Sequence, residues 1–305
     1  MGISDTRHRF GRIDYSLTVR EIFTHTTRHI ITSSQKLDVI CVKQRDKSQY
    51  DIPTWAPDWT RPSEKSGQMV LGLHHREPTF SAAGGSLAQC SYLHDGYVLK
   101  ATGFVIDRIK AVGMSLKKQG SPSDVTPSLQ VFHDWWNIFV GFIGNSTSAQ
   151  AAFARIISCG NWIFDNDQLY QDRLDAIFTL SKSQLIQYHR GKHKSREETD
   201  ALGLTKVPTD EDEKTQMASI LSASLMMNRR RLFIGSRNVP GLAPWDTETG
   251  DKICILLGCR FPVVLRRKGD QYVLIGEAYV EGMMDGQAMN SLKDGLFVLE
   301  DFEIR

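Results

Sequence analysis

The last third of the chain constrains the fold most, because short apolar runs alternate there with turn residues. Each run is rich in β-branched or aromatic residues, as strands are. The runs are Leu232–Gly235, Lys252–Leu257, Phe261–Arg266 and Gln271–Val280. Turn signals separate them at Val239–Gly241, Glu248–Asp251 and Lys268–Asp270. Closely spaced short strands of this kind predict an antiparallel sheet that curls into a small barrel.

The rest of the chain adds one clear strand and two helical regions. Tyr97–Val112 has the composition of a strand, in which Gly103 marks a bulge or bend. Apolar periodicity predicts a first helix over Ser16–Ser33, capped by Ser16. A helical block is expected over residues 128–228, with helices at Leu129–Phe142, from Thr147 or Ser148 through Ile156, at Asp167–Tyr188, and from Thr209 onward. Arg229, Arg230 and Arg231 end the last of these, where the helix dipole favours cations. The predicted fold class is α+β, an antiparallel barrel-like β-sheet with a helical insertion and an N-terminal helix.

These elements predict three parts along the chain. Residues 1–62 would form the N-terminal helix and an extended connector that contains tryptophan. Residues 63–116 and 231–305 would together form the β-rich barrel-like domain, and residues 117–230 the inserted helical block. In the connector, Asp51–Pro62 holds three prolines, which prevent a regular helix. Trp55 and Trp59 are costly to leave in water, so we expect both to pack against the body of the protein.

Composition removes several functional classes. The 305 residues carry 37 Lys+Arg against 35 Asp+Glu, a net charge of +2 that is too even to predict nucleic-acid binding. No apolar stretch approaches the roughly 18–20 residues that a membrane span needs. The five cysteines are few and scattered, which favours a reducing, cytoplasmic compartment. Gly2 and Thr6 fit the loose pattern for N-terminal myristoylation.

Spacing alone does not predict a metal centre or a cofactor. His25 and His29 lie four apart, as do His189 and His193, but neither pair has a third ligand nearby in the sequence. Cys254 and Cys259 lack a second close Cys or His pair, so buried, inert thiols are expected. The sequence therefore predicts no metal and no cofactor.

Three acidic residues at the end of the last predicted strand are the candidates for chemistry. Glu277, Glu281 and Asp285 sit where a strand runs into a tight turn, and paired carboxylates there can act as acid and base. They can equally cap turns and pair with Arg266 or Arg267. In an enzyme, which would be an uncharacterised hydrolase, Glu277 and Asp285 would face a pocket while Arg266 holds an anionic substrate. No nucleophile or metal ligand accompanies them, which favours a non-enzymatic protein. A barrel that senses a small ligand is a third alternative.

Several short blocks follow one another in a recognisable order. They are Asp14-Tyr15-Ser16, Leu37-Asp38-Val39, the run from Pro53 to Trp59, Gly103–Ile109, Arg231–Ile234, Gly241–Pro244, Gly250–Ile253, Pro262–Arg266 and Gly276–Met284. In this order and spacing the chain resembles fungal heterokaryon-incompatibility (HET domain) proteins, in the region that follows their N-terminal HET domain. Gln287 departs from the family pattern, which usually has Glu there.

The resemblance implies a non-catalytic accessory or regulatory region in non-self recognition and programmed cell death. The HET domain, which is similar to Toll/interleukin-receptor-like folds, is expected upstream of residue 1, so the chain would be a truncated product, a fragment or a mispredicted start. The implied partner is a protein or that upstream domain, with no nucleic acid and no known small ligand. Arg266, Glu277 and Asp285 remain candidate binding residues. The motif residues would be structural: Trp55, Asp58, Trp59, Gly241, Pro244, Gly250, Asp251 and Gly276.

Overall fold

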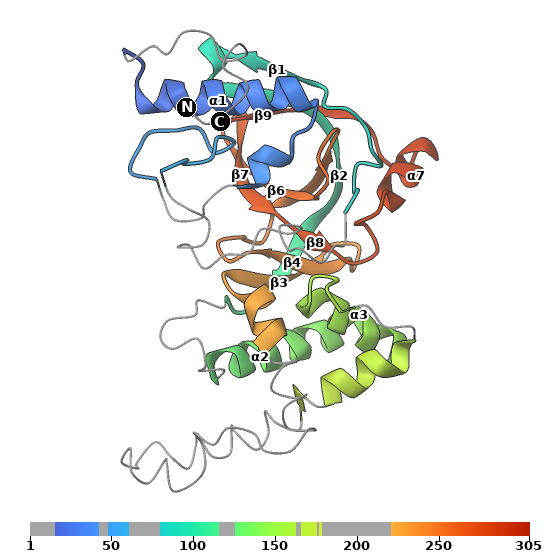
Figure 1. The fold of residues 1–305 in the computed structure, drawn as a ribbon. Helices are drawn as coiled ribbons and strands as arrows, with labels where there is room; N and C mark the ends of the chain where they lie inside the picture. The colour runs from blue at the N-terminus through green and yellow to red at the C-terminus, as the bar shows by residue number, and fades with distance from the viewer. Residues whose placement is uncertain are drawn as a thin grey trace, which may run out of the picture.

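The computed structural model describes residues 16–42, 48–60, 80–115, 126–162, 166–175, 177–178 and 221–305. The helices are α1 (Val19–Ser34), α2 (Thr126–Ile143), α3 (Thr147–Ile157) and α7 (Gln287–Lys293), with 3₁₀ helices η1 (Asp38–Val42) and η3 (His94–Gly96). The strands are β1 (Cys90–Leu93), β2 (Val98–Val112), β3 (Arg230–Gly235), β4 (Pro240–Pro244), β5 (Lys252–Leu256), β6 (Val263–Lys268), β7 (Gln271–Glu277), β8 (Tyr279–Val280) and β9 (Glu300–Ile304). Figure 1 shows these strands curled into a ring-like sheet beside helices, which confirms the α+β prediction.

The long strand β2 organises the sheet. The strand order is β5-β6-β7-β9-β2-β3-β4-β8, and β5 also pairs with β2, so β2, β5, β6, β7 and β9 close a ring. Every pairing is antiparallel except that of β7 with β9, which is parallel and joins only Tyr272 to Ile304. The ring is therefore closed narrowly at one seam and is not a regular barrel.

Irregularities in β2 let it change partners along its length. Its register shifts between Val105 and Asp107 while it pairs with β5, and between Ile109 and Ala111 while it pairs with β3. The bulge expected at Gly103 thus lies further along the strand, because Gly103 itself stays in register with Leu256. Each extra residue bends the strand and increases its twist. This bending carries β2 from the ring into the β3–β4 hairpin.

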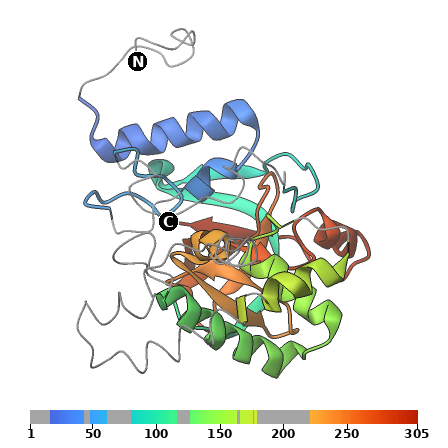
Figure 2. The same cartoon turned by 60° about the horizontal axis from the view of Figure 1, so that its bottom comes forward.

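Helices cover opposite sides of the sheet. Figures 1 and 2 place α1 on one side of the strands and the pair α2 and α3 on the other. The capping residue of α1 is Thr18 and not Ser16, because Thr18 forms a reciprocal capping box with Glu21. The guanidinium of Arg20 lies 3.2 Å from the ring centre of Tyr97, which anchors α1 to the start of β2.

The connector after α1 buries one of its two tryptophans. Trp55 is fully buried, and its indole Nε1 donates a hydrogen bond to the carbonyl of Tyr97 at 3.1 Å. Trp59 is 42% exposed, so of the two rings expected to pack against the body of the protein, only Trp55 enters the core. The reason lies at Asp58, whose carboxylate accepts hydrogen bonds from Ser48 and from the backbone and hydroxyl of Thr60. The chain turns around this buried carboxylate, and the neighbouring ring faces outward.

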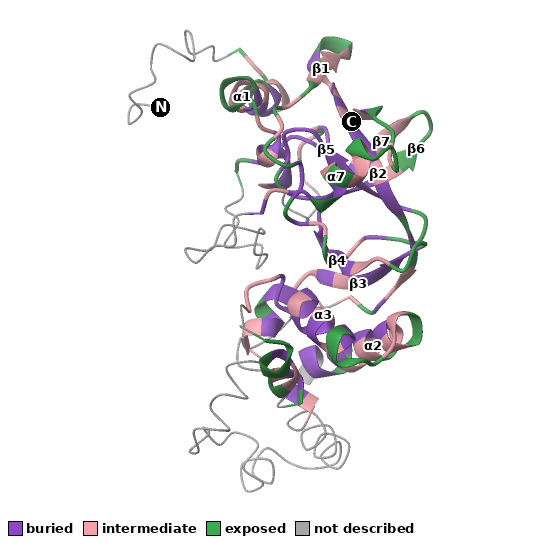
Figure 3. Cartoon of the chain, turned by 90° about the vertical axis from the view of Figure 1, so that its right-hand side faces the viewer, coloured by how far each residue is buried: buried purple, intermediate pink, exposed green. Residues whose placement is uncertain are grey.

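The predicted helical block is observed in part. α2 and α3 match the expected helices, α3 being capped by Ser146, and residues 167–175 and 221–227 are also helical. Aromatic rings pack these helices together: Phe132, Trp136, Phe139, Phe153 and Phe178. Figure 3 shows buried residues along the helices on the side toward β3 and β4. The expectations for Gly2, Asp14, Tyr15, His189, His193 and Thr209 lie outside the described residues.

Two predictions for the last third are corrected. Pro240 and Gly241, read as a turn, begin strand β4, and the turn lies earlier, at Ser236–Asn238, where Asn238 has φ +58°. Proline is tolerated at the first position of a strand, since its missing N–H is not needed there. Arg230 and Arg231, expected to end a helix, lie in β3. In the ranges that the structure describes, no helix has both the length and the apolarity required for a bilayer span.

Candidate functional site

The three predicted binding residues have different surroundings. Arg266, on β6, holds Asp251 with two hydrogen bonds of 2.9 Å, from Nε to Oδ1 and from Nη2 to Oδ2. It also lies 3.0 Å from a carboxylate oxygen of Glu248. The hydrogen bond with Asp251 raises the pKa of Arg266 above its ordinary value, against the opposing effect of burial. This bidentate geometry fixes the turn between β4 and β5, because both carboxylates belong to that turn.

Glu277, at the end of β7, pairs with Arg230 inside the protein. Arg230 Nη2 lies 2.7 Å from Glu277 Oε1, and the two side chains are 2% and 0% exposed. The arginine run therefore has a different role from the predicted one: Arg230 compensates a buried charge across the sheet. Arg231 donates to the carbonyl oxygens of Gly113 and Thr247. A buried ion pair of this kind tolerates the loss of neither partner alone.

Asp285 lies on the exposed loop that leads into α7. Its backbone N–H donates to the side-chain oxygen of Gln287 at 2.8 Å. Gln287, where the resembling family usually has Glu, thus supports the turn through an uncharged oxygen. Arg266 lies on β6, Glu277 at the end of β7 and Asp285 before α7. Their partners are also different: Asp251, Arg230 and Gln287 in turn.

The remaining motif residues lie where the backbone turns or where two strands pack closely. A Cβ at Gly241 would collide with the carbonyl oxygen of Tyr279 and lie 2.6 Å from the Phe233 ring, so β4 and β8 pack too closely for a side chain there. Pro244 ends β4 opposite Arg230. Gly250 and Gly276 have φ of +94° and +146°.

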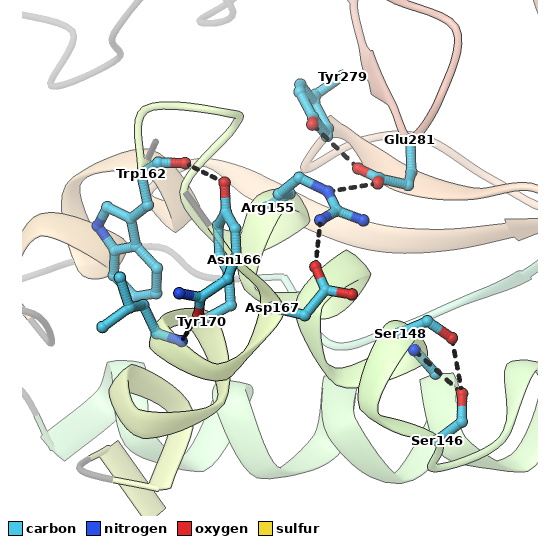
Figure 4. Close-up of polar contacts among 11 residues, drawn as sticks. Ser146, Ser148, Arg155, Trp162, Asn166, Asp167, Tyr170, Tyr279 and Glu281 are labelled. Atoms are coloured by element: carbon cyan, nitrogen blue, oxygen red, sulfur yellow. Dashed lines mark hydrogen bonds and ion pairs between the residues drawn. The ribbon is translucent and has the colours of Figure 1, made fainter. Parts of the chain in front are cut away.

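A polar cluster between α3 and the sheet was not predicted as a unit. Arg155, from α3, donates through Nε to Glu281 Oε1 at 2.7 Å, just after β8 (Figure 4). The hydroxyl of Tyr279 donates to the other oxygen of Glu281 at 3.0 Å. Arg155 Nη1 also lies 3.8 Å from Asp167, and its guanidinium carbon 5.3 Å from the ring centre of Tyr170. We call Arg155, Asp167, Tyr279 and Glu281 the helix–sheet clamp.

Burial sets the electrostatics of the clamp. Burial raises the pKa of Glu281, and hydrogen bonds from Arg155 and Tyr279 work against that rise. The pKa of Tyr279 is also raised, first by burial and then by the charge of Glu281. Burial lowers the pKa of Arg155, but the hydrogen bond and charge of Glu281 outweigh it and leave the pKa raised. Both oxygens of Glu281 are hydrogen-bonded, so the clamp serves to join α3 to β8.

The sequence marked only one of the four clamp residues as a candidate. Glu281 stood among the acidic candidates, but its partner Arg155 is 126 residues away, in a helix with no unusual pattern. The expected partners Arg266 and Arg267 are engaged elsewhere, with Asp251 and with Gly269. Among the described residues, no group of three or more His, Cys, Asp or Glu side chains could hold a metal ion.

Part or most of the chain is similar to proteins that are already known. Residues 166–299 match the family model described as the Het-6 beta-barrel domain. The chain is also 24% identical, over 355 aligned positions, to the protein named "Heterokaryon incompatibility protein 6, OR allele" of Neurospora crassa. That alignment covers 98% of this chain and 49% of the relative, so the chain spans about half the relative's length. No solved structure matches the chain. The resemblance seen in the sequence is thus confirmed: part of the chain matches the Het-6 beta-barrel domain, and nearly all of it is similar to a heterokaryon-incompatibility protein.

Proposed function

We propose that this chain is a non-catalytic regulatory or recognition region of a heterokaryon-incompatibility protein, acting in non-self recognition that leads to cell death. The proposal rests on one observation: three charged side chains that were candidates for chemistry are paired with other charged side chains of the protein. Arg266 is held by Asp251, Glu277 by Arg230 and Glu281 by Arg155. A catalytic carboxylate must reach the proton it transfers, whereas Glu277 is fully buried and hydrogen-bonded to an arginine. These pairs serve to hold the fold together.

The comparisons support a division of labour in proteins of this kind. The Neurospora relative is about twice as long as the aligned region, which leaves room for a separate effector part that this chain does not match. In this proposal the death-triggering part is an upstream HET domain, in the same polypeptide or in a partner protein. The region described here would control that part through contact, without chemistry of its own.

The direct test is to express the chain in fungal cells in two forms and to score cell death. One form is the chain alone, and the other is the chain fused behind a HET domain, with the HET domain alone as reference. We expect no death from the chain alone, and a fused protein whose activity differs from that of the free HET domain. Death caused by the chain alone, or a fusion that behaves as the free HET domain does, would overturn the proposal.

A second set of variants separates regulation from catalysis. Asp285→Asn removes the exposed carboxylate that a hydrolase would need and should leave the response of the fusion unchanged. The double variant Arg155→Ala/Glu281→Ala removes the helix–sheet clamp and should change the response. Arg267→Ala, at a side chain 69% exposed, is the matched surface control. Protein abundance is measured for each variant by immunoblot. A lost response in Asp285→Asn at normal abundance would favour an enzyme.

A further inference from the structure

Two cysteines that are far apart in the sequence touch in the core. Cys41 lies in η1, Cys259 lies just after β5, and their sulfur atoms are 3.6 Å apart. The two residues are 218 positions apart, and they are 0% and 1% exposed. Sequence spacing had associated Cys259 with Cys254 instead, because the true partner lies in the N-terminal part of the chain.

Hydrogen bonds on the flanking residues hold these two thiols together. The backbone N–H of Leu37 donates to the carbonyl of Gly258 at 2.9 Å. Asp38 accepts two hydrogen bonds of 2.8 Å from Arg260, one from the backbone N–H and one from Nε. The residues around Cys41 are thus fastened directly to those on both sides of Cys259. Groups held in contact in this way react with each other at a high effective concentration.

We propose that Cys41 and Cys259 are a modification site, at which a peroxide oxidises the two thiols to a disulfide. In the first step the sulfur of one cysteine, as thiolate, attacks a peroxide oxygen. An S–O bond forms, the O–O bond breaks, and the leaving hydroxide takes up the thiol proton as water. In the second step the other thiol attacks this sulfenic sulfur. The S–S bond forms, the S–O bond breaks, and a second water leaves with the remaining proton. The two thiols together lose two electrons and two protons, and one hydrogen peroxide is reduced to two waters.

The surroundings of Cys41 and Cys259 slow their oxidation and restrict it to small oxidants. The hydrogen bond with Cys259 and burial raise the pKa of the Cys41 thiol well above its ordinary value. Fewer thiolates mean slower oxidation, and full burial excludes large oxidants such as disulfide-containing proteins. Hydrogen peroxide is small enough to enter during local opening of the structure. The disulfide would then connect the segment of α1 and η1 covalently to the sheet.

Peptide mapping by mass spectrometry tests the proposal. Trypsin cuts after Lys36, Lys43, Lys252 and Arg260, so Cys41 falls in peptide 37–43 and Cys259 in peptide 253–260. Peptide 253–260 also holds Cys254, and Cys254→Ala makes the assignment unique. The folded variant is treated with hydrogen peroxide, its free thiols are alkylated, and it is digested without reductant. We expect a linked pair of these two peptides that is absent from untreated protein, from Cys41→Ala and after dithiothreitol.

Stability provides an independent readout. A disulfide that closes so long a loop should raise the Tm by roughly 5 °C, and dithiothreitol should reverse the rise. The comparison thiol is Cys90, which is only half-buried. If Cys41 and Cys259 both stay alkylatable at a peroxide dose that oxidises Cys90, the proposal is refuted. Should Cys254→Ala fail to fold, fragmentation of the linked peptide from the natural sequence, between residues 254 and 259, assigns the sulfur that is joined.

Discussion

Removal of Arg230 should destabilise the protein far more than removal of an arginine on the surface. In Arg230→Met the carboxylate of Glu277, which is 0% exposed, loses the guanidinium 2.7 Å away. Water cannot replace this partner at a buried position, and an uncompensated buried charge costs about 3–5 kcal/mol. The free energy of unfolding should fall by about that amount, a large share of the roughly 5–15 kcal/mol available to a typical folded protein.

The double variant Arg230→Met/Glu277→Gln provides the internal comparison. With the second charge also removed, no ion remains buried without a partner, so the double variant should recover part of the loss. Arg267→Met is the matched control, since Arg267 is on β6 and its side chain is 69% exposed. Exposed pairs contribute little to stability, and this variant should resemble the natural sequence.

Urea unfolding at pH 7, followed by circular dichroism, measures these differences. The midpoint should shift while the slope of free energy against urea stays constant, because the buried surface changes little. Two results would refute the reasoning. One is a loss in Arg230→Met no larger than in Arg267→Met, and the other is a double variant no more stable than Arg230→Met.

Four further predictions concern packing and pH. Trp55→Ala should cost about 3–5 kcal/mol through the cavity it leaves, whereas Trp59→Ala should cost little, and equal losses in thermal unfolding would contradict this. Gly241→Ala should cost about 1–3 kcal/mol because its methyl group meets the Tyr279 carbonyl. Gly141→Ala in α2, with open space around it, should stabilise the helix slightly. Because burial raises the pKa of Glu281, its contribution to stability is fully present below the ordinary value of 4.5 and is lost as pH rises through the raised folded value. Relative to Glu281→Gln, the natural sequence should therefore lose stability as pH increases over that range, and a flat difference in Tm would refute the assignment.

The strands of the last third could be predicted because each corresponds to a short apolar run bounded by turn residues. The runs at Lys252–Leu257 and Gln271–Val280 became β5 and the β7–β8 pair with small shifts at their ends. α7 was missed because it is short and begins after Gly286, which provides no side-chain cap. β9 carries exposed acidic residues next to buried Phe302 and Ile304, and its place in the sheet depends on β2, about 200 residues earlier.

The candidate site could be predicted only residue by residue. Glu277 and Glu281 were marked by their position at a strand end, but their partners Arg230 and Arg155 come from β3 and α3. Which arginine pairs with each glutamate depends on how segments far apart in the sequence pack, and no local sequence pattern predicts that. The contact between Cys41 and Cys259 was hidden for the same reason.

Because most partners of β2 come later in the chain, the sheet cannot be completed until late in synthesis. Its partners β3, β5 and β9 lie C-terminal to it, and β9 ends at Ile304, 192 residues after Val112 (304 − 112). At a synthesis rate of roughly 5–20 residues per second, about 10–40 s pass before the last of them leaves the ribosome. Until β3 has been made, β1 is the only strand of the described sheet with which β2 can pair, and apolar residues such as Phe104 and Ile106 lack most of the sheet that buries them. The nascent chain therefore exposes apolar strand residues for up to about 40 s, and we expect its yield to depend on chaperones that prevent aggregation during synthesis.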